Sequence, residues 1–215
     1  QEDYENENLL FLGTEYGLYI TVDGGLNWSH FTNNFPPVAI HFLELQKQTN
    51  DLVAGTHGRG VIIIDDISIL RQITPEILAK NVHFFDTKPG VMLEQSGFGG
   101  GSTELQFVGP NPGSSVKIQY YLKKRHTFGK MTLEIQDMDG NMLSKLSAGK
   151  SKGSNIVRWN YGGRAPKLAS GKTIASGGFQ PLRAKAGQYK AVMVKGKNQY
   201  ETTFEVKNDP QSSVT

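Results

Sequence analysis

A turn built on glycine and threonine occurs twice in the first third of this 215-residue chain, each time between two β-prone runs. The first copy is Leu12–Ile20, and the second is Ala54–Ile63, with one residue inserted. Gly13 and Gly55 therefore lie 55 − 13 = 42 residues apart. Because a four-stranded propeller blade takes about 40–50 residues, this interval predicts a β-propeller. Residues 1–65 can supply roughly one and a half blades of the four to eight that a ring needs. We therefore expect upstream propeller blades of the same polypeptide as partners.

The segment after the first copy has the pattern Ser/Thr-x-Asp-x-Gly-x-x-Trp, with Thr21, Asp23, Gly25 and Trp28 at its fixed positions. An aspartate can accept backbone N–H bonds across a tight turn, and a glycine permits the backbone geometry that the turn needs. Trp28 can pack beneath the hairpin. We interpret these four residues as structural, with no part in catalysis.

The second copy of the repeat contains the residues of the first 70 that look most functional. His57 can shuttle protons, and Arg59 can pair with a carboxylate or a phosphate. Both would line a ligand site if their loop faced the central channel of a propeller. In the alternative interpretation the glycines form the turn, and Arg59 pairs with Asp65 or Asp66.

The sequence offers no evident set of catalytic residues. Asp65 and Asp66 would point to opposite faces of a strand, whereas a glycosidase needs two carboxylates about 5–10 Å apart. With zero cysteines there is no thiolate nucleophile and no Cys-ligated zinc. The five histidines lie apart in the sequence, with no metal-ligand spacing. We predict no catalytic residue, no cofactor and no bound metal in this chain.

Charge is divided unevenly along the chain. Residues 1–83 hold 4 Lys or Arg and 11 Asp or Glu, a net charge of −7, whereas residues 84–215 hold 19 and 9, a net charge of +10. The basic part can attract polyanions, or both parts can be ordinary solvated surfaces. The aromatic and basic run at 120–126 suggests an acidic-glycan or phosphate surface, or simply an exposed strand end. Without a basic helix face or a zinc finger, we expect no nucleic acid partner. Without a run of about 18 apolar residues, we expect no membrane span.

The remaining pattern predicts an all-β chain. Residues 1–83 should form a partial β-propeller that ends in a short helical connector, and residues 84–215 an immunoglobulin-like β-sandwich. Trp159 and Tyr189 are the expected core aromatics. The strand candidates of the sandwich are Val116–Leu122, Met131–Gln136, Asn155–Asn160, Gln188–Val194 and Thr202–Val206.

Several of these segments resemble known families. The pattern at 21–28 matches the Asp box of neuraminidase repeats, and with Leu52–Gly60 and Asp65–Arg71 it resembles the end of a sortilin-type propeller in bacterial Asp-box repeat proteins. Residues 107–125 resemble the segment that follows that propeller. Residues 131–206 are similar to the immunoglobulin-like domain of the flagellar hook-capping protein.

The resemblance implies a function and a location. Asp-box repeat proteins are often labelled glycosyl hydrolase-like, and the exported members are periplasmic or extracellular. We expect a non-catalytic C-terminal accessory or structural module of a larger secreted Asp-box propeller protein, which can contribute to glycan or protein binding. The alternative is a part of a glycoside hydrolase-like propeller, in which His57 and Arg59 line an active site that upstream blades complete.

Overall fold

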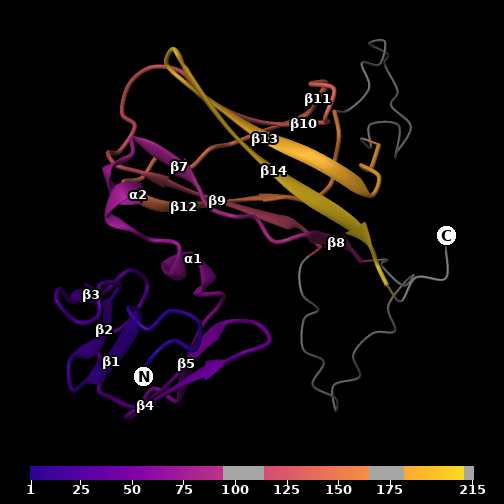
Figure 1. Cartoon of the computed structure of the whole chain (residues 1–215). Coiled ribbons are helices and arrows are strands. Elements are labelled where there is room, and N and C mark those ends of the chain that lie inside the picture. Colours follow the sequence, from indigo (N-terminus) through magenta and orange to yellow (C-terminus); the bar gives the residue numbers. More distant parts are fainter. Residues whose placement is uncertain (94–113, 165–181, 211–215) are drawn as a thin grey trace, which may run out of the picture. The chain divides into compact units, whose positions relative to one another are not determined.

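The computed structural model describes residues 1–93, 114–164 and 182–210. The chain forms two compact units, Gln1–Ala79 and a second unit that begins at Lys80, a few residues before the predicted boundary at residue 83. The described residues contain fourteen strands, β1 to β14, and two short helices, α1 (Ser68–Arg71) and α2 (Pro75–Ala79) (Figure 1). The mostly β character and the short helices of the connector are therefore confirmed.

The first unit contains two three-stranded antiparallel sheets with the same sequential order. Short apolar runs that are separated by tight turns pair with their nearest neighbours in the sequence, which explains this order. The strands are β1 (Leu10–Thr14), β2 (Gly17–Thr21) and β3 (Ser29–Phe31) in one sheet, and β4 (Ile40–Gln46), β5 (Asp51–Thr56) and β6 (Val61–Ile64) in the other.

The N-terminal segment adds a partner to the free edge of β1. The ammonium group of Gln1 donates to the carbonyl oxygen of Phe11 at 2.9 Å, and the Phe11 N–H donates to the Gln1 carbonyl at 2.8 Å. The Asp3 N–H donates to the carbonyl of Leu9 at 2.9 Å. The N-terminal segment therefore pairs with β1 in the way that β4 pairs with β5. In each sheet the strand that leads into the repeated turn has a preceding segment along its other edge.

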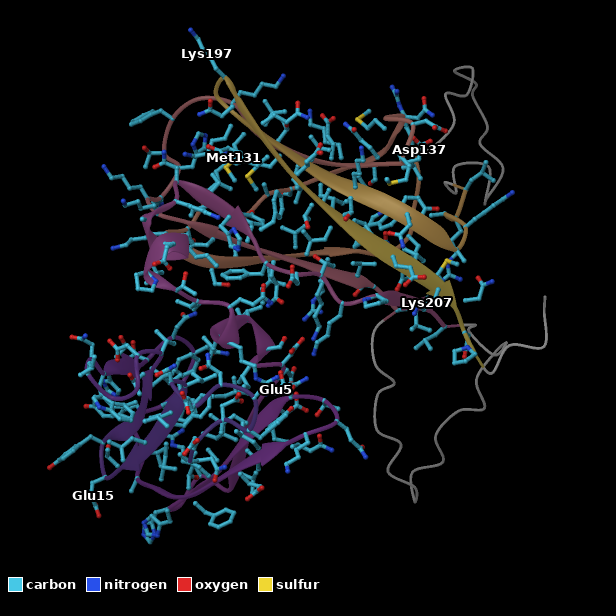
Figure 2. All side chains as sticks on the ribbon, in the orientation of Figure 1. Glu5, Glu15, Met131, Asp137, Lys197 and Lys207 are labelled. Atoms are coloured by element: carbon cyan, nitrogen blue, oxygen red, sulfur yellow. The ribbon has the colours of Figure 1, made fainter. Side chains whose placement is uncertain are left out.

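The two copies of the sequence repeat occupy equivalent places in this plan. The first copy forms the β1–β2 turn, where the Thr14 hydroxyl donates to the Gly17 carbonyl at 3.0 Å. The second copy forms the β5–β6 turn, where the Thr56 hydroxyl donates to the Gly60 carbonyl at 2.7 Å. Figure 2 shows Glu15 projecting outward from the first of these turns. The repeat in the sequence is thus also a repeat in structure.

The two sheets of the first unit share one core. Strand β1 approaches β4 so closely that a Cβ atom on Gly13 would lie 2.7 Å from a methyl carbon of Ile40, which leaves no room for any other residue there. The buried members of this core are Leu9, Phe11, Leu18, Phe35, Val38, Ile40, Leu45, Leu52, Ala54 and Ile67.

The second unit contains a five-stranded sheet in the order β11-β10-β13-β14-β8 and a three-stranded sheet in the order β12-β9-β7. All neighbours are antiparallel except β14 and β8, which pair in parallel. The five predicted strands are present, with ends that differ by a few residues. The strands are β7 (Val82–Phe84), β8 (Gly90–Met92), β9 (Val116–Leu122), β10 (Met131–Gln136), β11 (Met142–Leu146), β12 (Gly153–Trp159), β13 (Gly187–Lys195) and β14 (Asn198–Asn208).

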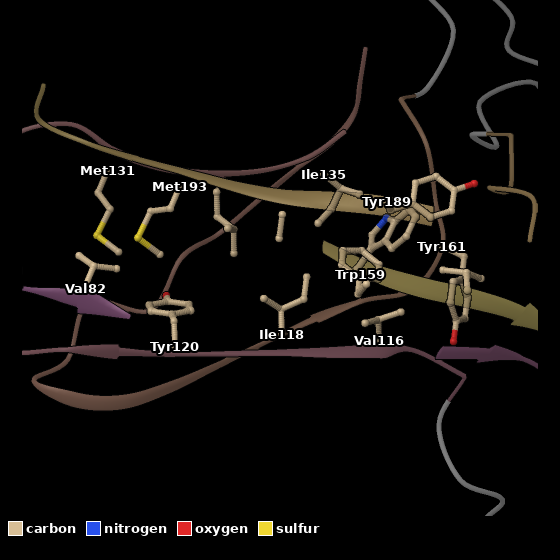
Figure 3. Close-up of a cluster of buried hydrophobic side chains, with 14 of the residues drawn as sticks. Val82, Val116, Ile118, Tyr120, Met131, Ile135, Trp159, Tyr161, Tyr189 and Met193 are labelled. Carbon is tan, nitrogen blue, oxygen red and sulfur yellow. The ribbon is translucent and has the colours of Figure 1, made fainter. Parts of the chain in front are cut away.

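The core of the second unit lies between these two sheets (Figure 3). Trp159 is fully buried, and its ring lies 5.3 Å from that of Tyr189 and 5.9 Å from that of Phe204. The prediction of Trp159 and Tyr189 as core aromatics is confirmed. The indole N–H of Trp159 is hydrogen-bonded within this core, since it donates to the Gly162 carbonyl at 2.9 Å. Burial raises the pKa of Tyr120 to about 12, and its hydroxyl donates to the Gly149 carbonyl at 2.7 Å.

Several predicted features lie outside the described residues. The composition of the sequence predicts a flexible glycine-rich loop at 96–102 and a long polar loop at 163–184. The first loop, most of the second and the first part of the segment at 107–125 lie outside the described residues.

Candidate functional site

The Asp-box segment connects β2 to β3 and is closed by its own side chains. The Thr21 hydroxyl donates to Asp23 Oδ1 at 2.6 Å and accepts the Gly25 N–H at 3.1 Å. The Asn27 N–H donates to Asp23 Oδ1 at 2.9 Å, and the Asn27 side-chain amide donates to Asp23 Oδ2 at 2.8 Å. Hydrogen bonds from Thr21 and Asn27 lower the pKa of Asp23 to about 2.

This arrangement holds the turn together and leaves little of the carboxylate for chemistry. Both oxygens of Asp23 accept bonds from within the turn, and Gly25 has a φ of +93°, which favours glycine. Trp28 lies against Gly25, since a Cβ atom there would be 3.8 Å from the indole nitrogen. The Trp28 side chain nevertheless stays 40% exposed, so it covers the turn from the side and is only partly packed.

His57 and Arg59 both lie in the exposed β5–β6 turn. The His57 N–H donates to the Ala39 carbonyl at 2.9 Å, and the His57 ring stacks on that of His41 with centroids 5.4 Å apart. Among the described residues Arg59 forms no ion pair. The carboxylate of Asp66, one of its two expected partners, accepts the Ser68 hydroxyl at 2.6 Å. The structure thus joins His57 to His41, which the sequence did not suggest, and leaves Arg59 at the turn.

A shallow cavity of about 260 Å³ lies beside this histidine pair, between β1 and β4. Gln1, His41 and Phe42 are among its lining residues. The described part of the chain holds no group of three or more His, Cys, Asp or Glu side chains placed to bind a metal ion. The lining of the cavity contains no carboxylate that could act with these imidazoles as an acid–base pair.

The second unit has a wider groove of about 500 Å³ between β7 and the start of β14. Its lining includes Lys80, His83, Tyr200 and Glu201. Burial lowers the pKa of His83, and the charge of Lys80 lowers it further, while Asp86 opposes the change. His83 is therefore neutral at neutral pH and adds no charge to this groove.

The sheet of β4, β5 and β6 has an apolar face on the side away from the core. Phe42 is 64% exposed, Val61 is 65% exposed, and Ile63 is 58% exposed. The register places Gly55 between Phe42 and Val61 in one row, and Val53 beside Ile63 in the next. The continuous apolar run at 61–64 predicts a strand that is buried on both faces, whereas this face is open. We call Phe42, Val53, Val61 and Ile63 the open face.

The first sheet shows the same property in a milder form. On the side away from the core, the register places Leu12, Tyr19 and His30 in one row across β1, β2 and β3. Leu12 is 46% exposed, and the rings of Tyr19 and His30 stack at 4.5 Å. A strand whose second face meets water normally carries polar residues there. The sheet of β4, β5 and β6 lacks this polar outer face, whereas Tyr19 and His30 give the first sheet a mixed one.

A buried ion cluster in the first unit was not predicted. The Arg71 guanidinium binds Asp3 through two bonds of 2.8 Å, from Nε to Oδ1 and from Nη2 to Oδ2. The Nη1 atom of Arg71 donates to the Asn50 side-chain oxygen at 2.6 Å and lies 3.1 Å from a Glu5 carboxylate oxygen. The Cζ atom of Arg71 lies 4.6 Å from the centroid of the Tyr4 ring. The Asp3 side chain is 0% exposed and that of Arg71 is 10% exposed.

The electrostatics of this cluster favour both charges. Burial alone would raise the pKa of Asp3, but hydrogen bonds from Arg71 and from the backbone N–H groups of Glu5 and Asn6 lower it below its ordinary value. Burial works against the charge of Arg71 as well, and the bond to Asp3 raises its pKa. One signal in the sequence pointed to this cluster: Arg71 is one of only two arginines in the acidic first 83 residues.

Comparisons with protein-family models, with curated proteins and with solved structures found no match for this chain. Within the residues that the structure describes, no helix is long and apolar enough to cross a membrane. Function must therefore be argued from the side chains themselves.

Proposed function

We propose that this chain is a non-catalytic C-terminal accessory or structural module of a larger secreted Asp-box propeller protein, in the periplasm or outside the cell. In this proposal the sheets of the first unit are blades of a sortilin-type propeller. The second unit is an immunoglobulin-like β-sandwich that follows the propeller. Neither His57 nor Arg59 needs a catalytic role.

The open face carries this proposal. Full burial of a Phe, Val or Ile side chain contributes about 1.5–3 kcal/mol, so three such side chains in water forgo several kcal/mol of stabilisation. An apolar patch on a sheet is typical of a surface that another layer covers. Glu44 is the charged residue in the two cross-strand rows that form the open face, since it lies opposite Val53. It lies on the edge strand β4, where water can still reach its carboxylate when another layer packs on the open face.

The expected cover is another sheet of the same kind. Within the first unit the inner faces of the two sheets already pack on each other through residues such as Phe11 and Leu52. The open face again presents apolar rows, so a further sheet can stack on it in the same way. The repeated Thr–Gly turns and the Asp box, a pattern of propeller blades, agree with this stacking.

The state of the carboxylates supports a non-catalytic role. Asp23 is engaged within its turn, Asp3 is buried against Arg71, and Asp66 accepts hydrogen bonds from Ser68. A glycosidase needs two carboxyl groups across a cleft that admits a sugar. These three aspartates have structural partners instead.

The test compares the 215-residue chain with the native polypeptide isolated from its source. The double variant Phe42→Ser and Ile63→Ser should change the free energy of unfolding of the 215-residue chain by less than about 1 kcal/mol. In the native polypeptide it should lower that free energy by about 2 kcal/mol or more, because the side chains are then buried. Tyr16→Ser, at a turn residue that is 76% exposed, is the matched control.

Two results would overturn the proposal. One is an intact mass of the native polypeptide that equals these 215 residues alone. The other is equal destabilisation of both proteins by the double variant, which would mean that no further sheet covers the open face.

A further inference from the structure

Three connections of the second unit meet at one end of its sheets. Leu122, the last residue of β9, pairs with Gly153, the first residue of β12. Met131, the first residue of β10, pairs with Lys195, which in turn pairs with Asn198 at the start of β14. The connections at this end are residues 123–130, 147–152 and 196–197.

This end of the second unit is strongly basic. The three connections contain no Asp or Glu, so no acidic residue within them offsets their positive charge. All the cations there are exposed except Lys195, which is half-buried. Figure 2 shows Lys197 pointing outward from the tip of the β13–β14 hairpin. We call this group the basic end, and its members are Lys123, Lys124, Arg125, Lys130, Lys150, Lys152, Lys195 and Lys197.

Backbone hydrogen bonds hold the three connections together. The His126 N–H donates to the carbonyl of Lys150 at 3.0 Å, which joins the first connection to the second. The Gly196 N–H donates to the carbonyl of Lys130 at 3.0 Å, which joins the first to the β13–β14 hairpin. Cations that lie far apart in the sequence are therefore presented on one surface, where their potentials add.

Two lysines on the five-stranded sheet have acidic neighbours. Lys207 forms an ion pair with Glu205 at 3.3 Å, and Lys145 lies opposite Glu134 across β11 and β10. The three connections of the basic end contain no Asp or Glu that could act in this way within them.

We propose that the basic end binds an acidic polysaccharide, a sugar chain that carries carboxylate or sulfate groups. This inference rests on the second unit alone and does not depend on the proposed role of the first. Seven of the eight cations are lysines, which act as compact point charges and suit anionic groups spaced along a flexible chain. A site that reads phosphates or bases with bidentate geometry would favour arginine.

The aromatic content of this end also favours a sugar. Phe128, in the connection 123–130, is 90% exposed, so its ring is available to stack on the apolar face of a sugar ring. Binding of single-stranded nucleic acid uses several aromatic rings on which successive bases stack, and these connections offer one. Insertion into a membrane needs a larger apolar surface than a single phenylalanine.

The test uses the full chain and measures its affinity for polygalacturonate and for dextran sulfate at physiological salt, with neutral dextran as a control ligand. A charge variant of the basic end should bind at least one of the two acidic polymers about tenfold more weakly or worse, because each lost cation removes counterion release. A control variant with the same change in net charge should bind within about twofold of the parent chain. The charge variant is K124Q/R125Q/K150Q/K197Q, and the control variant is K145Q/R158Q/K190Q/K207Q.

A second variant separates stacking from charge. Phe128→Ser should weaken binding about threefold while the salt dependence of the affinity stays unchanged, because no charge is lost. The proposal is overturned if both charge variants weaken binding equally, or if neutral dextran binds as well as the acidic polymers. It is also overturned if phosphatidylglycerol vesicles or a single-stranded DNA bind more tightly than either polysaccharide.

Discussion

The two units of this chain are both built from short β-strands, but they differ in how the faces of their sheets are covered. In the second unit two sheets enclose one core, with Trp159 and Phe204 buried between them. In the first unit two sheets also share a core, yet the sheet of β4, β5 and β6 has a second apolar face, which leaves Phe42 and Val61 mostly exposed. A closed pair of sheets has no need of a further layer, whereas a stack can always accept one more.

The difference appears in the spacing of apolar residues along single strands. In β9, the inward residues Ile118 and Tyr120 alternate with Lys117 and Tyr121, which are only partly buried. All four residues of β6 are apolar, so neither face of this strand carries a polar side chain that would favour contact with water. A strand of this kind is typical of the interior of a larger β-structure.

The largest expected effect comes from truncating phenylalanine in each unit. Phe204→Ala removes a ring from the closed core and should lower the free energy of unfolding by about 3–5 kcal/mol. Phe42→Ala on the open face should change it by less than about 1 kcal/mol in the 215-residue chain. Urea unfolding followed through tryptophan emission in a Trp28→Phe background, where Trp159 is the remaining tryptophan, measures the first. Amide hydrogen exchange in β5 measures the second. Equal losses would end the distinction between a closed and an open unit.

A smaller effect tests what stabilises the first unit besides its core. Arg71→Ala leaves the Asp3 carboxylate buried without its partner, which should cost about 2–3 kcal/mol. The N-terminal segment should then detach from β1. Exchange of the Phe11 N–H, which donates to the Gln1 carbonyl, is the direct measurement. Lys207→Ala, which breaks the exposed pair with Glu205, should change stability by less than about 0.5 kcal/mol. If Phe11 exchanged no faster in Arg71→Ala, the cluster would not anchor the segment.

Sequence reasoning succeeded where structure is local. The hairpins at the two Thr–Gly turns and the strand at 116–122 were predictable, because turn residues and alternation act over a few neighbours. It failed for β8, which pairs in parallel with β14, so that Gly90 lies opposite Val206. A three-residue strand whose partner lies more than a hundred residues away leaves no local pattern.

The candidate sites follow the same rule. The pattern at 21–28 is one short stretch of sequence, and Thr21 and Asp23 make their contacts within a single turn. The Arg71–Asp3 pair and the basic end depend on chain segments that folding brings together. Part of the basic end was visible as the run at 120–126, but the lysines at 150 and 197 could not be assigned to the same surface without the register of the strands.

The smallest expected effect is the loss of stability in acid at one turn of the first unit, the turn that contains Asp23. Hydrogen bonds from Thr21 and Asn27 lower the pKa of Asp23 from 3.8 to about 2. Because the folded-state pKa lies below the unfolded one, this stabilisation is complete above about pH 4 and is lost as the pH falls toward 2. Asp23→Asn should therefore lower the melting temperature of the first unit at pH 6 and reduce the difference in melting temperature between pH 6 and pH 2.5.

Asp137 in the second unit provides the matched control for that experiment. Its carboxylate accepts the Asn141 N–H at 2.8 Å and the Asn141 side-chain amide at 2.9 Å, and these bonds lower its pKa as well. Asp137→Asn should reduce the acid sensitivity of the β10–β11 turn and leave the amides of β2 and β3 unchanged in hydrogen exchange. If Asp23→Asn melted with the same dependence on pH as the parent chain, the Asp-box carboxylate would not be the group that titrates, and the turn would be held by Thr21 and Gly25 alone.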